Sequence, residues 1–336
     1  MTILKHSFYS RKSVMYEELQ GKTVLVTGGA GFIGSHLSER LVKEGANVVC
    51  VDNLSTGREA NLKRLLENPA CKFVRADVNR FDEVASIFGD NKIDYVFHYA
   101  ALVGVKNVIE RPLEVFKDID GIKYLLALAH AHRVKKIVFA SSSEAYGEPT
   151  QLPEREEGQL NVNANDPYGL TKLVGENMVK NYFRRYGLAG TSLRFFNVYG
   201  PRQNSSAYGF VVGIFMDKAI RGEQMTIFGN GTQTRDFVFI DDNVEAGIRA
   251  LLSQKANGET INVGSGRQTT IVELAERISR IVGVDFKPTY LPERSVEIRY
   301  RCPYTAKMRE LLGFEASVSL DDGLRRTFEW YRSENK

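Results

Sequence analysis

Short apolar runs alternate with amphipathic stretches over the first two thirds of the chain. The runs are continuous and rich in Val, Ile and Phe, as expected for strands that are buried on both faces of a sheet. They cover residues 22–29, 46–53, 72–78, 93–101, 135–142 and 190–198. The stretches 35–45 and 121–134 between them carry helical spacing. This alternation predicts an α/β fold with a doubly wound parallel sheet, the Rossmann architecture.

The pattern loosens after about residue 200. Glycines and polar residues cluster at 200–209 and 228–236, and helical and strand-like segments follow. We therefore expect a smaller C-terminal α/β lobe that packs over the sheet. The predicted division is an N-terminal extension over 1–20, a Rossmann domain over 21–198 with returning segments near 237–266, and a substrate-binding lobe over 199–236 and 267–336.

Composition and charge restrict the classes of protein to which this chain can belong. Lys plus Arg number 45 against 41 for Asp plus Glu, and this small surplus is no footprint for nucleic acid. Cys50, Cys71 and Cys302 form no CxxC pair, which argues against a disulfide framework or a zinc site. Residues 1–20 lack the apolar run of a signal peptide, and no stretch approaches the length of a membrane span. We therefore expect a cytoplasmic protein without a metal site and without a membrane or nucleic-acid partner.

The stretch TGGAGFIG (27–34) places Gly28, Gly31 and Gly34 between a predicted strand and a predicted helix. Such a loop turns sharply, lets a pyrophosphate approach the backbone, and presents free N–H groups at the helix start. Asp52 ends the next strand, eighteen positions after Gly34, near the spacing expected of a carboxylate that binds a ribose 2′-hydroxyl. A carboxylate there repels a 2′-phosphate, so the pattern favours NAD over NADP, with Arg58 as a nearby opposing charge.

Asp77 follows the third predicted strand and has two interpretations. With Val78 it is placed to meet the adenine of a dinucleotide, or it caps the helix pattern FDEVASIF that begins at Phe81. His98 stands at a strand end before small residues, and we expect it to be packed and hydrogen-bonded there.

Tyr168 and Lys172 lie four positions apart in DPYGLTKLVGE. This spacing places them on one face of a helix, roughly 6 Å apart along its axis. A free tyrosine has a pKa of about 10, and a nearby ammonium and a positive nicotinamide ring favour its ionised form. The pair could therefore remove a proton from a sugar or alcohol hydroxyl.

Several motifs together resemble the extended short-chain dehydrogenase/reductases, and more narrowly the nucleotide-sugar epimerases and dehydratases, closest to UDP-hexose 4-epimerases. The motifs are TGGAGFIG, HYAA (98–101), SSSEAYG (141–147), YGLTK (168–172) and RFFNVYGPRQ (194–203). The resemblance runs from about Lys22 to Tyr331. It implies an NAD-binding Rossmann domain, a lobe that binds a nucleotide-diphosphate sugar such as a UDP-sugar, and a homodimer. The apolar stripe formed by Ile122, Leu125, Leu126 and Ala129 is a candidate dimer surface.

The resemblance also assigns roles to single residues. Tyr168 is the implied base, Lys172 orients the nicotinamide ribose and lowers the pKa of Tyr168, and Ser142 hydrogen-bonds the reacting oxygen. The implied substrate contacts are Ser142, Asn197, Arg235, Arg294 and Glu297. The implied cofactor contacts are Gly28, Gly31, Phe32, Ile33, Gly34, Asp52, Asn53, Ser55, Thr56, Gly57, Asp77, Val78, Tyr99, Ala100, Ala101, Val103, Tyr168 and Lys172.

Two positions depart from the family pattern. Asp118 in FKDIDG stands where the family usually has asparagine. The substitution affects a contact with NAD or with the sugar that the family pattern would imply at this position. Tyr99 in HYAA stands where leucine or phenylalanine is more usual, and a position beside the cofactor can absorb that change.

Three hypotheses for the reaction follow from these residues. A 4-epimerase oxidises the sugar at C4, lets the keto sugar turn over, and returns the hydride to the other face. A lyase, either a UDP-glucuronate decarboxylase or a 4,6-dehydratase, passes through the same keto sugar. A non-catalytic NAD-binding protein would have lost Ser142, Tyr168 or Lys172, and all three residues are present.

The residues after Ser142 bear on the choice between epimerase and lyase. Dehydratases of the family carry Asp-Glu there, whereas Ser142-Ser143-Glu144 matches the decarboxylase triplet. The stretch ALVGVKNVIERP (101–112) resembles the epimerases instead of the proline-rich turn of decarboxylases. We therefore favour a UDP-sugar 4-epimerase acting on a glucose, N-acetylhexosamine or uronate substrate, with Ser143 and Glu144 as additional candidate catalytic residues.

Overall fold

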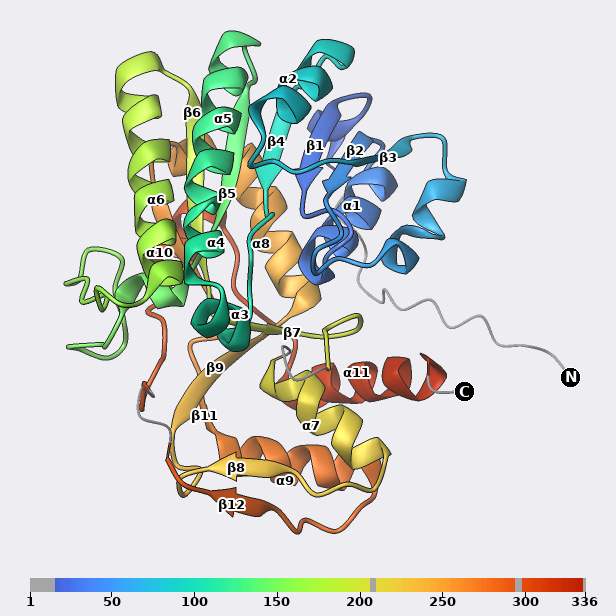
Figure 1. Cartoon of the computed structure of the whole chain (residues 1–336), viewed down its shortest axis with the longest axis vertical. Helices are drawn as coiled ribbons and strands as arrows, with labels where there is room; N and C mark the ends of the chain where they lie inside the picture. The colour runs from blue at the N-terminus through green and yellow to red at the C-terminus, as the bar shows by residue number, and fades with distance from the viewer. Residues whose placement is uncertain (1–15, 206–209, 294–297, 335–336) are drawn as a thin grey trace, which may run out of the picture.

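The centre of the molecule is a parallel sheet of seven strands. The computed structural model describes residues 16–205, 210–293 and 298–334, and within them the strand order is β10–β6–β5–β4–β1–β2–β3 (Figure 1). The strands are β1 (Thr23–Thr27), β2 (Asn47–Asp52), β3 (Cys71–Arg75), β4 (Tyr95–His98), β5 (Lys136–Ser142), β6 (Ala189–Phe195) and β10 (Thr260–Val263). The order reverses between β1 and β4, and ligands bind at such a switch point, outside the carboxyl ends of the strands. The predicted doubly wound α/β fold is confirmed.

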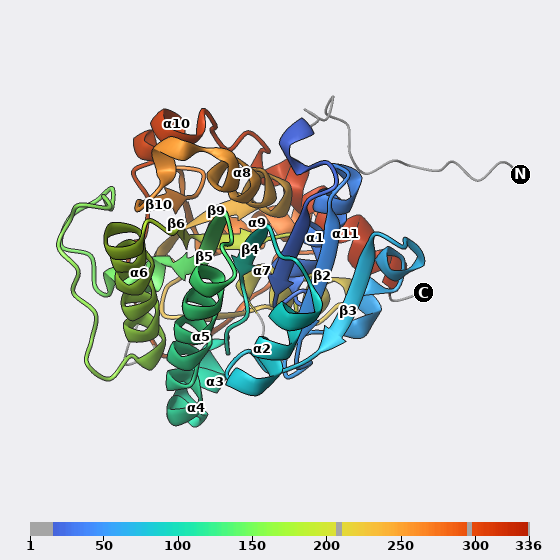
Figure 2. The same ribbon diagram turned by 90° about the horizontal axis from the view of Figure 1, so that it is seen from above.

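Helices cover both faces of the sheet, as the view from above shows (Figure 2). One face packs against α2 (Phe81–Asp90), α5 (Asp118–Ala131) and α6 (Pro167–Tyr186). The other face packs against α1 (Phe32–Lys43) and α8 (Ile240–Leu252). Along β1, Val24 and Val26 join the core on the α1 side and Leu25 joins the core on the α5 side. Both faces of the strands other than the edge strand β3 are largely buried, which explains the unbroken apolar runs.

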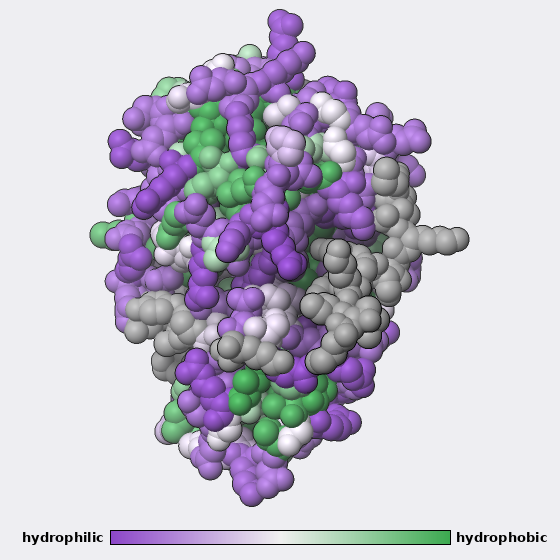
Figure 3. Space-filling view, turned by 90° about the vertical axis from the view of Figure 1, so that its right-hand side faces the viewer, coloured by the Kyte–Doolittle hydropathy of each residue, from purple (hydrophilic) through white to green (hydrophobic). Residues whose placement is uncertain are grey.

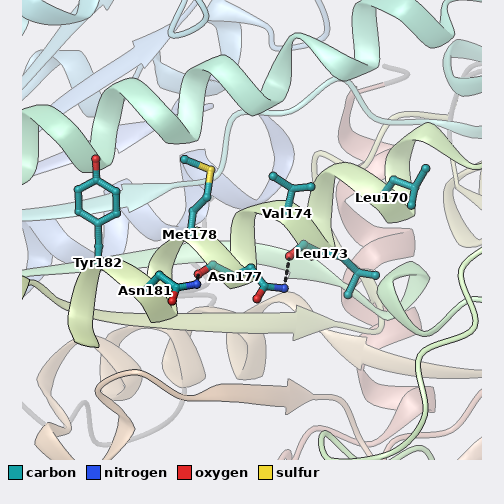
Figure 4. Close-up of a pocket in the computed structure, with 7 residues that line it drawn as sticks. All are labelled: Leu170, Leu173, Val174, Asn177, Met178, Asn181 and Tyr182. Carbon is teal, nitrogen blue, oxygen red and sulfur yellow. Dashed lines mark hydrogen bonds between the residues drawn. The ribbon is translucent and has the colours of Figure 1, made fainter. Parts of the chain in front are cut away.

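The apolar stripe of α5 faces the protein's own core. Ile122, Leu125, Leu126 and Ala129 each expose 1 % of their surface or less, because they pack with the sheet and with α2. The interpretation of this stripe as a dimer surface is therefore wrong. A shallow groove on α6 is open to solvent and is lined by Leu170, Leu173, Val174, Asn177, Met178, Asn181 and Tyr182 (Figure 4). The homodimer itself stays a prediction.

A smaller group of elements lies below the sheet in Figure 1. Its strands are β7 (Asn197–Tyr199), β9 (Thr234–Phe239) and β11 (Gln268–Thr270) in one sheet, and β8 (Thr226–Phe228) with β12 (Thr289–Leu291) in another. Its helices α7 (Val211–Ile220), α9 (Ile271–Val282) and α11 (Leu320–Glu334) pack against one another. In contrast, α10 (Ala306–Leu312) packs against α8 and β10, so late segments of the chain return to the large sheet. The domain boundaries stay a prediction.

The described chain begins on the α1 side of the sheet. Leu19 has no exposed surface, and the backbone N–H of Tyr16 donates to Glu44 at 2.9 Å. The hydroxyl of Tyr16 donates to Glu245 of α8 at 2.6 Å. The last residues of the predicted N-terminal extension are therefore packed onto helices of the Rossmann layer.

The surface carries mixed polarity. On the face presented in Figure 3, hydrophobic residues gather in separate areas between hydrophilic ones. None of the helices in the described ranges combines the length and the apolar character that crossing a membrane requires.

Candidate active site

The glycine loop between β1 and α1 leaves no room for side chains. A Cβ atom on Gly34 would lie 2.1 Å from the carbonyl oxygen of Gly28. Gly28 itself has a φ of +69°, and a Cβ there would lie 2.8 Å from the backbone nitrogen of Ala100. Gly31 precedes α1 without a side-chain cap, so N–H groups of the first helical turn stay free for an anion. This cradle fits the pyrophosphate of a dinucleotide.

Asp52 is held by the backbone at the end of β2. One carboxylate oxygen accepts a hydrogen bond from Ala30 N at 3.1 Å and the other from Leu54 N at 2.8 Å. A Cβ atom on Gly57 would lie 2.7 Å from this carboxylate, so Gly57 makes room for Asp52. Burial raises the pKa of Asp52, and the two N–H groups oppose the rise. The side chain is thus fixed in place before any ligand binds.

Asp77 lies at the cleft and does not cap α2. The N-cap of α2 is Arg80, and no side chain caps this helix. Asp77 instead accepts a hydrogen bond from Asn79 N at 3.0 Å, and with Val78 it lines the cleft. The capping interpretation is therefore wrong.

These groups line one cleft of about 450 Å³ at the carboxyl edge of the sheet. Every predicted cofactor contact except Gly57 lines it, and Ser142 lines it as well. The lining also includes residues that were not predicted as contacts, among them the charged or polar Arg111, Lys117, Arg202 and Asn204 and the aromatic Phe210. They come from the segment around α4 (Pro112–Phe116) and from the loop after β7. Three of them lie within stretches that the sequence analysis had compared with the family: Arg111 in ALVGVKNVIERP, Lys117 in FKDIDG and Arg202 in RFFNVYGPRQ.

Ser142, Tyr168 and Lys172 meet where β5 ends and α6 begins. Asp166 caps α6 by accepting hydrogen bonds from Tyr168 N and Gly169 N, both at 3.1 Å, and Pro167 is the first helical residue. The Ser142 hydroxyl accepts a hydrogen bond from Glu144 N at 3.2 Å and is close enough to Tyr168 to lower its pKa. Lys172 Nζ donates to the carbonyl oxygen of Ala140 at 2.8 Å and lies 5.3 Å from the centre of the Tyr168 ring. The structure therefore brings the three predicted residues together.

Burial and neighbouring groups shift the pKa values of Tyr168 and Lys172. Burial raises the pKa of Tyr168, the Ser142 hydroxyl opposes the rise, and the charge of Glu144 adds to it. Burial lowers the pKa of Lys172 to about 8, against the attraction of Asp118 and Glu176. Tyr168 is therefore a neutral phenol at neutral pH in the protein alone.

His98 takes no part in this cluster. Its Nδ1 lies 2.8 Å from the hydroxyl oxygen of Thr27, and burial lowers the pKa of the ring to about 3. The prediction of a packed, hydrogen-bonded histidine is confirmed. Among the described residues, no group of three or more His, Cys, Asp or Glu side chains is arranged to hold a metal ion.

Ser143 and Glu144 lie beside the cleft and are not part of its lining. Arg301, 1 % exposed, donates to the backbone carbonyls of Ser143 and Gly147. The same guanidinium contacts Glu154 at 3.1 Å and Glu144 at 3.4 Å. Arg301 was not predicted as a site residue, because nothing in its own neighbourhood of the sequence connects it to the end of β5.

The predicted substrate contacts that the structure describes do not lie together. Within the described ranges, Ser142 is the one predicted substrate contact that lines the cleft. Asn197 on β7 and Arg235 on β9 donate to backbone carbonyls at 3.0 and 2.8 Å. Arg294 and Glu297 lie outside the described residues. These four assignments stay predictions.

Several known proteins are similar to this chain in sequence, and two solved structures among them are similar in fold. A UDP-glucose 4-epimerase of Thermotoga maritima, solved with UDP-glucose, is 37 % identical with a TM-score of 0.88, over 94 % of this chain and 100 % of that one. A UDP-glucuronic acid 4-epimerase of Bacillus cereus, solved with UDP-glucuronic acid and NAD, is 31 % identical with a TM-score of 0.84, over 93 % of this chain and 99 % of that one. A UDP-N-acetyl-alpha-D-glucosaminuronate decarboxylase of Bacillus cytotoxicus is 38 % identical, over 93 % of this chain and 98 % of that protein.

The family assignment rests on these similarities and on a match over most of the chain. The sequence profile that matches residues 24–264 is described as the NAD dependent epimerase/dehydratase family. The predicted resemblance to this family and the prediction of NAD as its cofactor are both confirmed at this level. The chain belongs to the NAD dependent epimerase/dehydratase family.

Proposed function

We propose that the protein is an NAD-dependent 4-epimerase of UDP-sugars with a glucose, N-acetylhexosamine or uronate unit. The observation that carries the proposal is the cluster of Ser142, Tyr168 and Lys172, held on the wall of the cleft that the glycine loop also lines. A base, a hydroxyl donor and a buried lysine beside a dinucleotide cradle are what reversible oxidation of a sugar alcohol requires.

The residues of the cleft fit NAD. The glycine loop would hold the pyrophosphate, and Asp52 would accept hydrogen bonds from the adenosine ribose. When bound, NAD supplies hydride acceptance and return at the sugar C4. The T. maritima and B. cereus epimerases, solved with UDP-glucose and with UDP-glucuronic acid plus NAD, support this assignment by analogy.

Side chains of the protein would transfer the proton and hold the reacting groups in position. Tyr168 takes the proton of the sugar 4-hydroxyl and gives it back to the same oxygen, while Ser142 donates a hydrogen bond to that oxygen. Lys172 is anchored on the carbonyl of Ala140, so its charge stays next to the Tyr168 ring. A positive charge at this point favours the ionised tyrosine, against the burial that raises its pKa.

A uronate decarboxylase is the second candidate function. The triplet Ser142-Ser143-Glu144 and the 38 % identical decarboxylase of B. cytotoxicus favour it. Against it, Ser143 is buried, and the carboxylate of Glu144 is turned toward Arg301 beside the cleft. This pairing supports the epimerase, because it gives the Glu144 carboxylate a structural partner outside the lining of the cleft.

The test is to incubate the purified protein with UDP-glucose, UDP-N-acetylglucosamine and UDP-glucuronate and to identify the products by NMR and mass spectrometry. A product of unchanged mass with inverted C4 supports the epimerase. A UDP-pentose would establish the decarboxylase instead, and a 4-keto-6-deoxy sugar would establish a dehydratase. A Glu144→Gln variant that still epimerises would show that this carboxylate is dispensable for epimerisation.

A further inference from the structure

Asp118 brings a carboxylate to the catalytic half of the cleft. It is the first residue of α5, and it lines the same cleft as Ser142, Tyr168 and Lys172. The family pattern usually carries asparagine at this position, which is neutral. This chain therefore has an additional carboxylate on the wall of the cleft, within electrostatic range of Tyr168 and Lys172.

The surroundings of Asp118 suit an ionised carboxylate. One oxygen accepts a hydrogen bond from Leu102 N at 2.9 Å, and the other faces the side-chain amide nitrogen of Asn79 at 3.4 Å. Both partners are N–H donors, and each oxygen of an ionised carboxylate accepts hydrogen bonds from such donors. Asn79 leaves its own buried carbonyl oxygen without a hydrogen-bond partner in the described part of the chain. The amide is thus oriented for a carboxylate at position 118.

The charge of Asp118 is only partly compensated. Asp118 has no ion pair within 4 Å among the described side chains, although Arg111 and Lys117 line the same cleft. Burial raises the pKa of Asp118, and the charge of Asp77 after β3 adds to the rise, whereas Lys172 on α6 and the N–H groups of Leu102 and Asn79 oppose it. Lys172 is already bound to the carbonyl of Ala140. The field of Asp118 therefore extends into the cleft, where low dielectric strengthens it.

We propose that Asp118 makes the cleft select the oxidised over the reduced form of the nicotinamide cofactor. The oxidised ring carries a positive charge and the reduced ring is neutral, while the rest of the dinucleotide is the same. A carboxylate on the cleft wall therefore stabilises one form and not the other. The inference rests on the proposed function, in which NAD occupies this cleft with its nicotinamide toward Tyr168.

This selection suits a reaction that restores its cofactor in every cycle. An epimerase that retains the reduced form after losing its keto sugar cannot begin another turnover. A fixed negative charge lowers the free energy of the oxidised state and so favours return of the hydride to the sugar. Asp118 would thus keep the resting protein in its active form.

The experiment measures the dissociation constants of NAD⁺ and NADH by calorimetry on nucleotide-free protein at pH 7, without any sugar. The variants are Asp118→Asn and Asp118→Ser, which both remove the charge. The matched control is Asp120→Asn on the same helix, where the side chain is 47 % exposed and faces Lys123 at 3.9 Å. We expect both Asp118 variants to reduce the preference for NAD⁺ over NADH by about tenfold, and the control to leave it unchanged.

Asp118→Asn keeps the shape of the side chain, and a turned Asn79 amide would pair with it, so the variant should fold. Thermal unfolding of each variant checks this. An unchanged NAD⁺/NADH preference in the two Asp118 variants would overturn the inference, and so would an equal change in Asp120→Asn. Wild-type protein that binds neither dinucleotide would overturn the proposed function itself, which separates the two failures.

Discussion

The two halves of the cleft work by different physical means. Over β1 to β3, Gly28 and Gly34 shape the backbone, and both oxygens of Asp52 are fixed by N–H groups. Over β4 to β6, Tyr168 and Lys172 are buried ionisable groups whose pKa values depend on neighbouring charges. The first half would bind through its backbone shape and through the fixed carboxylate of Asp52, so it should fail when atoms are added or when that carboxylate loses its charge. The second half acts by charge and should fail when a proton or a charge is removed.

Removal of the Tyr168 hydroxyl should break the second half alone. Tyr168→Phe removes the group that takes the proton, so turnover should fall about 1,000-fold or more, whereas dinucleotide affinity should stay near that of the wild type. Steady-state rates and calorimetry measure the two effects separately. Tyr182→Phe, in the exposed groove of the same helix, is the matched control. A Tyr168→Phe protein with a near-normal rate would remove this residue from the mechanism.

Gly34→Ala should break the first half alone. Its Cβ would lie 2.1 Å from the backbone oxygen of Gly28, and backbone atoms on both sides limit the adjustment. Dinucleotide affinity should fall by about 100-fold, equivalent to ~2.7 kcal/mol and within the range of overpacking costs. Gly89→Ala is the control, because a Cβ there meets nothing within 4 Å. Equal affinities in the two variants would contradict the steric account.

Asp52→Asn should weaken the first half without adding atoms. The variant keeps the size of the side chain and loses the charge that would bind the ribose hydroxyls, so NAD affinity should fall about tenfold. NADP affinity should fall less or rise, because repulsion of the 2′-phosphate is relieved. Calorimetry with both dinucleotides gives the comparison. Unchanged NAD affinity would mean that Asp52 does not bind the ribose.

The smallest effect concerns the charge of Lys172. The pKa of Lys172 is about 8 in the folded protein, whereas its ordinary value is 10.5. Between pH 8 and pH 10.5 the unfolded chain therefore binds more protons at this group than the folded protein does. Stability should therefore rise as the pH increases from about 8 to 10.5 and stay level for this group below 8. In Asp118→Asn the ammonium loses its attracting carboxylate, so the rise should begin up to about one pH unit lower, worth ~1 kcal/mol or less.

Urea unfolding of both proteins at half-unit pH steps measures this shift. The Asp120→Asn variant serves again as the control for loss of a charge outside the cleft. If the rise begins at the same pH in the wild type and in Asp118→Asn, the two groups are not electrostatically coupled.

The parts of the site that depend on short spacing could be predicted from the sequence. Gly28 and Gly34 are six positions apart in one loop, and Tyr168 and Lys172 are one helical turn apart. Their geometry follows from the local backbone, so the motif contains the information. The sheet could also be predicted from the sequence, because strands that are buried on both faces appear as continuous apolar runs.

Contacts between distant segments could not be predicted in this way. Arg301 meets Glu144 although 157 residues separate them. The pattern from Ile122 to Ala129 showed that one face of a helix is buried, but a helical stripe does not say which surface covers it. The sheet of the same chain covers it, and this is why the predicted dimer surface was wrong.

The most direct test of the central claim is to follow deuterium placed at C4 of a UDP-sugar that the protein converts. If the hydrogen at C4 leaves and returns within one cleft, the C4-inverted product should keep the deuterium at C4, without added cofactor. Mass spectrometry and NMR of the product would show both the label and the configuration. Loss of the label to solvent, or a labelled product that has lost C6 with its C4 configuration unchanged, would contradict the account.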